Sequence, residues 1–112
     1  MIVEKQHLED FVLLKVEGVI KLGESAQFFA QTLERTLDDG QGHVLIDLAK
    51  INYIDSTGIG ELVGYLGRFR DRRRKVILIN PSQRILDLLR VAKLEHLFPI
   101  YPTVEQAIAG ER

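Results

Sequence analysis

Three side chains with reactive or charged groups follow one another at Asp55-Ser56-Thr57, and Gly58 and Gly60 come shortly after them. An apolar run precedes this stretch and a helical pattern follows it, so the three residues stand where a helix begins. Each is a residue type that caps helix N-termini by accepting a hydrogen bond from a free backbone N–H. One helix needs a single such cap, and we therefore expect at least one hydroxyl to be free for chemistry.

The sequence around Ser56 disfavours catalysis by that hydroxyl. No histidine or lysine lies close to it, and the stretch does not match the G-x-S-x-G elbow of serine hydrolases. It also has one residue more than the D-[ST]-G loop of aspartic proteases. The glycines miss the G-x-G-x-x-G spacing of dinucleotide-binding loops, and no P-loop motif is present. We expect a protein that is not an enzyme and uses no cofactor.

Composition excludes further classes of site and partner. The chain has no cysteine, and its three histidines are too scattered to form a metal site. A net charge of −1 argues against direct binding to nucleic acid. The N-terminus does not read as a signal peptide, and no apolar run approaches the roughly 18 residues that span a bilayer. We expect a cytoplasmic protein without membrane insertion.

Modification of the hydroxyl is the chemistry that remains. Phosphorylation of Ser56 would add about 1.5 to 2 negative charges at a helix N-terminus, beside the carboxylate of Asp55. A protein that had packed against this corner would then meet a desolvated dianion, and such a conflict costs several kcal/mol of binding free energy. Phosphorylation would therefore switch binding without refolding the domain.

The rest of the chain predicts the elements that hold this corner. Period-two alternation predicts a strand over 11–18 and a weaker one over 2–7, while short apolar runs at 44–48 and 76–79 are typical of buried strands. Helical spacing predicts helices over 24–37 and from Ser56 onward. We expect Asn80 to cap a third helix and Thr103 to cap a short last one. The fold class is α/β, with a mixed, mostly parallel sheet of four or five strands and packed helices, in one domain over residues 1–112.

Two features of the helix after Ser56 leave alternatives open. Gly60, Gly64 and Gly67 share one arc of the helix, and they either let it lie close to a sheet or a neighbouring helix, or form a smooth groove for a partner. The basic run Arg68–Lys75 near its end is either a solvated C-terminus, favourable to the helix dipole, or a surface for an acidic patch on a partner.

The order of these elements resembles the STAS domain, and in particular the stand-alone bacterial anti-sigma factor antagonists. The most specific part of the resemblance runs from Leu45 to Leu66: an apolar strand, a spacer, and then Asp-Ser-Thr-Gly-Ile-Gly. Residues 84–98 fit the helix that follows in that family. The resemblance covers essentially the whole chain.

The resemblance implies a partner-switching function, with Ser56 as the phosphorylation site. The unphosphorylated protein would bind an anti-sigma factor, which is a serine/threonine kinase, and so free the sigma factor. The kinase would phosphorylate Ser56 and then dissociate from the protein, and a PP2C-type phosphatase would restore the serine. We expect a monomer or weak dimer, with a partner-binding surface formed by Asp55, Ser56, Thr57, Gly58, Ile59, Gly60, Gly64 and Gly67.

Three positions depart from the family pattern. Val19 and Lys21 stand where the family usually has acidic residues, in a loop that lies near the phosphorylation site. Lys93 stands at about the place of a glycine that usually follows the third helix, and its side chain tolerates the left-handed backbone of such a cap poorly. The changes at Val19 and Lys21 motivate an alternative function, a constitutive STAS scaffold or regulatory subunit of an ABC lipid-transport or signalling complex.

Overall fold

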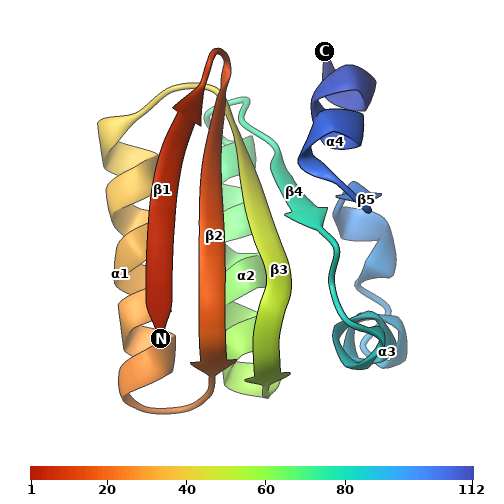
Figure 1. The fold of residues 1–112 in the computed structure, drawn as a ribbon. Coiled ribbons are helices and arrows are strands. Elements are labelled where there is room, and N and C mark those ends of the chain that lie inside the picture. The colour runs from red at the N-terminus through yellow and green to blue at the C-terminus, as the bar shows by residue number, and fades with distance from the viewer.

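The computed structural model describes all 112 residues and shows a five-stranded sheet with helices on both faces (Figure 1). Along the chain the elements are β1 (Ile2–Leu8), β2 (Phe11–Ile20), α1 (Glu24–Asp39), β3 (His43–Ile54), α2 (Ser56–Arg70), β4 (Val76–Ile79), α3 (Gln83–Val91), a 3₁₀ turn (Glu95–Leu97), β5 (Ile100–Tyr101) and α4 (Val104–Glu111).

The strands lie in the order β1-β2-β3-β4-β5. β1 and β2 form an antiparallel hairpin, and every later strand runs parallel to its neighbour. The predicted mixed, mostly parallel sheet is confirmed. α1 and α2 pack side by side on one face of the sheet, whereas α4 lies on the other face (Figure 1).

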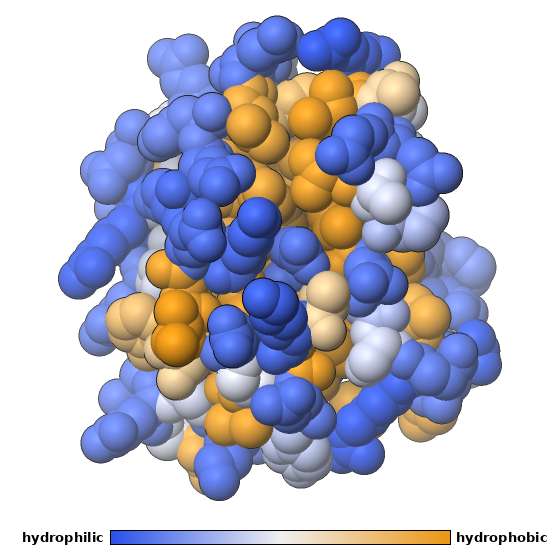
Figure 2. Space-filling model, in the orientation of Figure 1, coloured by the Kyte–Doolittle hydropathy of each residue, from blue (hydrophilic) through white to orange (hydrophobic).

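Alternation along the central strands divides the core between the two faces. Val44, Ile46 and Leu48 of β3 join a cluster of 21 buried residues under α1, α2 and α3. Leu45 points the other way and joins a smaller cluster of six, which α4 covers through Ala107. Figure 2 views this second face and shows hydrophobic surface gathered beside α4. Burial on both faces explains why β3 and β4 begin as continuous apolar runs.

β3 extends well beyond the run at 44–48, as far as Ile54. Lys15 and Glu17 of β2 are two residues apart, yet they pair with Asp47 and Lys50, which are three apart. A second shift of the same kind follows between Gly18 and Val19, so β3 carries two extra residues, β-bulges that interrupt the period-two pattern. The interruption hid the second half of the strand from sequence analysis, although this half brings Ile54 to the start of α2.

The caps of the last two helices divide into one confirmed prediction and one wrong one. Thr103 caps α4 by accepting a hydrogen bond from the backbone N–H of Gln106 at 3.1 Å, as predicted. Asn80 does not cap α3, because its backbone N–H still pairs with Tyr101 O of β5. Ser82 is the cap instead, accepting from the N–H of Ile85.

Candidate functional site

Asp55 is the residue that caps α2. One oxygen of its carboxylate, Oδ1, accepts a hydrogen bond from Gly58 N at 3.0 Å, and Oδ2 accepts one from Leu22 N at 2.9 Å. The backbone N–H of Asp55 donates to Ile20 O at 3.1 Å. The two N–H bonds to the carboxylate hold the pKa of Asp55 below its ordinary value, and the bond from Leu22 has a larger effect than the bond from Gly58. Asp55 thus joins the start of α2 to the loop between β2 and α1.

Because Asp55 serves as the cap, the two hydroxyls that follow it are released from that role. Ser56 is the first residue of α2 and is exposed to solvent, and no hydrogen bond of the structure involves its hydroxyl. Thr57 is partly exposed and is also free of side-chain hydrogen bonds. Of the three candidate caps, one is used and two remain available.

Gly58 and Ile59 lie beneath this corner. Ile59 is 6% exposed and belongs to the large core cluster. A Cβ on Gly58 would stand 2.7 Å from the side chain of Ile54 and 2.8 Å from that of Ile20. The absence of a side chain at Gly58 is therefore what lets α2 begin so close to the ends of β2 and β3. Both residues position the exposed ones above them.

The three later glycines of α2 behave differently. Gly60, Gly64 and Gly67 are exposed, and a Cβ added to any of them would meet no atom within 4 Å. The interpretation that they allow close packing against the sheet or a neighbouring helix is therefore wrong. They leave a stretch of bare backbone on the outer side of α2, which another molecule can approach closely.

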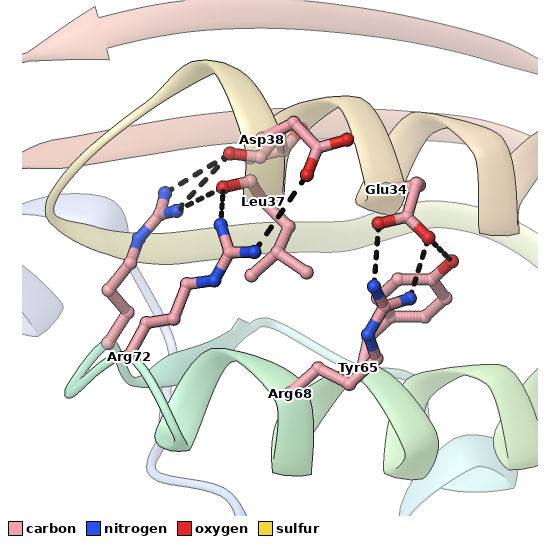
Figure 3. Close-up of polar contacts among 8 residues, drawn as sticks. Glu34, Leu37, Asp38, Tyr65, Arg68 and Arg72 are labelled. Atoms are coloured by element: carbon pink, nitrogen blue, oxygen red, sulfur yellow. Dashed lines mark hydrogen bonds and ion pairs between the residues drawn. The ribbon is translucent and has the colours of Figure 1, made fainter.

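The basic run at the other end of α2 makes contacts within the chain. Arg68 forms two hydrogen bonds to the carboxylate of Glu34 on α1, at 2.6 and 2.8 Å. Arg72 donates to Leu37 O at 2.8 Å and lies 3.9 Å from Asp38 (Figure 3). Both side chains are therefore engaged with α1. The two predictions for the basic run, a freely solvated helix end and a free surface for an acidic partner, do not hold for Arg68 and Arg72.

Arg74 completes this contact from a buried position. Its side chain is only 6% exposed and its guanidinium lies over the ring of Phe69, at 4.7 Å. It donates to Gly42 O at 2.6 Å and to the carbonyls of Thr36 and Leu37 at 3.2 to 3.3 Å. α1 has no basic residue in its own last turn. Arg72 and Arg74, in the turn that follows α2, therefore satisfy free carbonyls at the end of α1, an arrangement that sequence spacing did not reveal.

Lys93 adopts a left-handed backbone conformation although its side chain tolerates that conformation poorly. Its φ is 59°, and its N–H donates to Arg90 O while the N–H of Leu94 donates to Leu89 O. This pair of bonds is the Schellman motif, in which glycine is the usual residue. The cap geometry is kept, with a lysine in the strained position.

No group of three or more His, Cys, Asp or Glu side chains is arranged to hold a metal ion. None of the helices is both long enough and apolar enough to cross a lipid bilayer. The start of α2 therefore offers the free hydroxyl of Ser56, the neighbouring carboxylate of Asp55 and an open helix surface.

Known structures share this fold. A crystal structure of the Thermotoga maritima protein TM1081 superposes with a TM-score of 0.88, at 21% identity over 96% of this chain and 92% of that one. The anti-sigma factor antagonist SpoIIAA superposes in its unphosphorylated form with a TM-score of 0.75, at 16% identity over 99% of this chain and 98% of that one. Its phosphorylated form, from Bacillus, gives 0.77 at 17% identity, covering 99% and 100%.

Sequence comparison leads to the same group of proteins. The anti-sigma-B factor antagonist of Staphylococcus epidermidis is 28% identical over 96 residues, which are 82% of this chain and 84% of that protein. Residues 3–107 match the family described as the STAS domain. The chain therefore belongs to the STAS domain family.

Proposed function

We propose that this protein is an anti-sigma factor antagonist that is switched by phosphorylation at Ser56. The observation that carries the proposal is the division of roles at the start of α2, where Asp55 supplies the cap and the Ser56 hydroxyl is exposed and unbonded. Relatives named as anti-sigma factor antagonists and a phosphorylated SpoIIAA of the same fold support it. Residues 1–112 act here as one STAS domain.

In the unphosphorylated state the corner and outer side of α2 bind an anti-sigma factor that is a serine/threonine kinase, and the sigma factor is released. The exposed part of this surface is Ser56, Thr57, Gly60, Gly64 and Gly67. Asp55, Gly58 and Ile59 shape it from below. Bare backbone at the glycines lets the partner approach to a distance that side chains would prevent.

Phosphorylation reverses the binding. The kinase transfers the γ-phosphoryl group of ATP to Ser56 Oγ, and ADP and the hydroxyl proton leave. The new group brings about 1.5 to 2 negative charges next to the Asp55 carboxylate. A partner packed on this surface would have to bury unpaired charge, and a loss of about 3 kcal/mol lowers affinity more than a hundredfold. A PP2C-type phosphatase hydrolyses the phosphoserine and restores binding.

The protein is a binding switch and not an enzyme in this scheme. No basic side chain hydrogen-bonds the Ser56 hydroxyl, so nothing within the chain activates it as a nucleophile. The kinase and the phosphatase supply the chemistry, and this chain supplies the acceptor.

The test compares Ser56→Ala and Ser56→Asp with the wild type for binding to the anti-sigma factor kinase of the same organism. We expect Ser56→Ala to bind without being switched off by ATP and Ser56→Asp to bind at least tenfold more weakly. Glu105→Ala on α4, an exposed change on the opposite face of the sheet, is the matched control and should bind as the wild type does. Equal affinities of the two Ser56 variants would contradict the proposal.

A constitutive scaffold within an ABC lipid-transport or signalling complex is the second candidate, motivated by Val19 and Lys21, which stand where the family usually has acidic residues. Intact-mass analysis of the protein from growing and stressed cells separates the two functions. Phosphorylation adds roughly 80 Da on Ser56, and its change with growth condition supports the switch. A protein that carries no phosphate in any condition and co-purifies with a transporter ATPase would support the scaffold.

A further inference from the structure

The loop between β2 and α1 is fastened to the start of α2 on both sides of Lys21. Ile20 O accepts a hydrogen bond from Asp55 N at 3.1 Å, and Leu22 N donates to Asp55 Oδ2 at 2.9 Å. Lys21 is the single residue between these two contacts. Its Cα is separated from Leu22 N by only one carbonyl carbon, so its side chain begins beside the Asp55–Ser56 corner.

The backbone of Lys21 is fixed from the other side by α1. Lys21 N donates to Ser25 Oγ at 2.9 Å, and Lys21 O accepts from Ser25 Oγ at 3.1 Å and from Ala26 N at 3.0 Å. The chain at this residue is therefore held by α1 and by α2 together. The backbone of Lys21 is fixed, whereas its exposed side chain is free to turn. A lysine side chain reaches roughly 6 Å from Cα to Nζ.

The ammonium group of Lys21 has no ionic partner in this state. None of the ion pairs in the structure includes it. Two acidic groups are near. Asp55 already accepts two backbone N–H bonds, and Glu24 lines the same open pocket as Lys21, together with apolar residues such as Leu22 and Phe28. An unpaired cation thus extends from a backbone whose two neighbouring residues, Ile20 and Leu22, are bonded to Asp55, the residue before Ser56.

We propose that Lys21 is the intramolecular counter-ion of the phosphoryl group on Ser56, pairing with it only in the phosphorylated state. This inference rests on the proposed function. The pair offsets the repulsion between the phosphate and Asp55, so that the phosphorylated protein holds its charge without disturbing the cap. It also makes the loop around Lys21 a reporter of the phosphorylation state.

The experiment incorporates phosphoserine at position 56 during synthesis, so that no kinase is needed, and follows the ³¹P chemical shift of the full-length protein against pH. The second pKa of phosphoserine is ordinarily near 6. Pairing with Lys21 favours the dianion, and we expect the titration midpoint to rise by about 0.5 pH unit in Lys21→Gln. Lys21→Glu should raise it further, and 1 M salt should remove most of the difference between Lys21→Gln and the wild type.

Lys15→Gln is the matched control, because Lys15 is an exposed lysine on β2, the strand that precedes Lys21, away from this corner. It should titrate as the wild type does. A midpoint in Lys21→Gln equal to that of the wild type would overturn the inference and leave the switch untouched. In contrast, a phosphoserine-56 protein that bound the anti-sigma factor kinase as tightly as the unmodified one would overturn the proposed function, whatever the effect of Lys21.

Discussion

The two ends of α2 have opposite characters. At the N-terminal end, a single carboxylate satisfies the backbone, the next hydroxyl is free and the outer surface is bare. At the C-terminal end, Arg68, Arg72 and Arg74 bind side chains and carbonyls of α1. The helix is anchored at one end and left accessible at the other. Under the proposed function, phosphorylation would change the charge at the accessible end without loosening the fold, because the contacts that hold α2 to α1 lie at the far end.

Helix dipoles add to this division. The free carbonyls at the end of α1 carry partial negative charge, and they meet guanidinium groups. The first turn of α2 carries partial positive charge, and Asp55 is the only acidic residue at this end of the helix. Substitutions at the two ends of α2 therefore separate what each end contributes to stability and to binding.

Removal of the buried guanidinium should have the largest effect. Arg74→Ala removes the side-chain donor of the Gly42 and Thr36 carbonyls, leaves Leu37 O with Arg72 alone and empties the space over Phe69. We expect the free energy of unfolding to fall by about 3 kcal/mol in urea denaturation. Arg70→Ala, an exposed change in the same basic run, should shift it by less than about 0.5 kcal/mol. A loss below about 1 kcal/mol for Arg74→Ala would mean that the arginine contact does not anchor α2.

Gly58, at the accessible end of α2, also contributes to stability. Gly58→Ala places a methyl group 2.7 Å from Ile54 and 3.0 Å from Ile20 O, and backbone cannot move aside cheaply. We expect a loss of about 2 kcal/mol in the same denaturation experiment. An unchanged urea midpoint would show that the start of α2 shifts freely away from the sheet.

Gly64→Ala should act in the reverse sense on stability. Its added methyl meets open space, and alanine is the better helix former, so we expect unfolding to become about 0.5 to 1 kcal/mol more costly. Under the proposed function the same methyl should weaken binding to the anti-sigma factor kinase, which titration calorimetry measures. A variant that is more stable and binds equally well would remove Gly64 from the binding surface.

The smallest effect should be the pH dependence that Asp55 contributes. Its folded-state pKa is lowered by the N–H bonds from Leu22 and Gly58, so its stabilising effect is complete above the ordinary pKa of about 4 and is lost as pH falls through the lower folded value. Asp55→Asn should therefore be less stable than the wild type at pH 7, and the gap should narrow in acid. Parallel stability curves for the two proteins would contradict this assignment.

Periodicity and the Asp-Ser-Thr-Gly-Ile-Gly junction were enough to predict four strands and four helices, their order and the mixed, mostly parallel sheet, although β5 and the second half of β3 were not located. These features are local, because apolar spacing within one segment already decides whether it forms a helix or a strand. The cap at Thr103 was predicted for the same reason, since its partner is three residues away. The prediction at Asn80 failed because Asn80 has a left-handed backbone just after β4 and its N–H pairs with β5, a distant segment, so the cap falls two residues later at Ser82.

Tertiary structure decided what the residues at each end of α2 do. Three adjacent residues were equally able to cap the helix, and the contact between Asp55 and Leu22, 33 positions apart, ties that cap to the loop before α1. The glycines had two open interpretations until the packing showed which side of α2 faces solvent. Arg74 reaches carbonyls of α1 more than 30 positions earlier. A sequence states which groups need partners, but only the folded chain brings distant donors and acceptors within hydrogen-bonding distance.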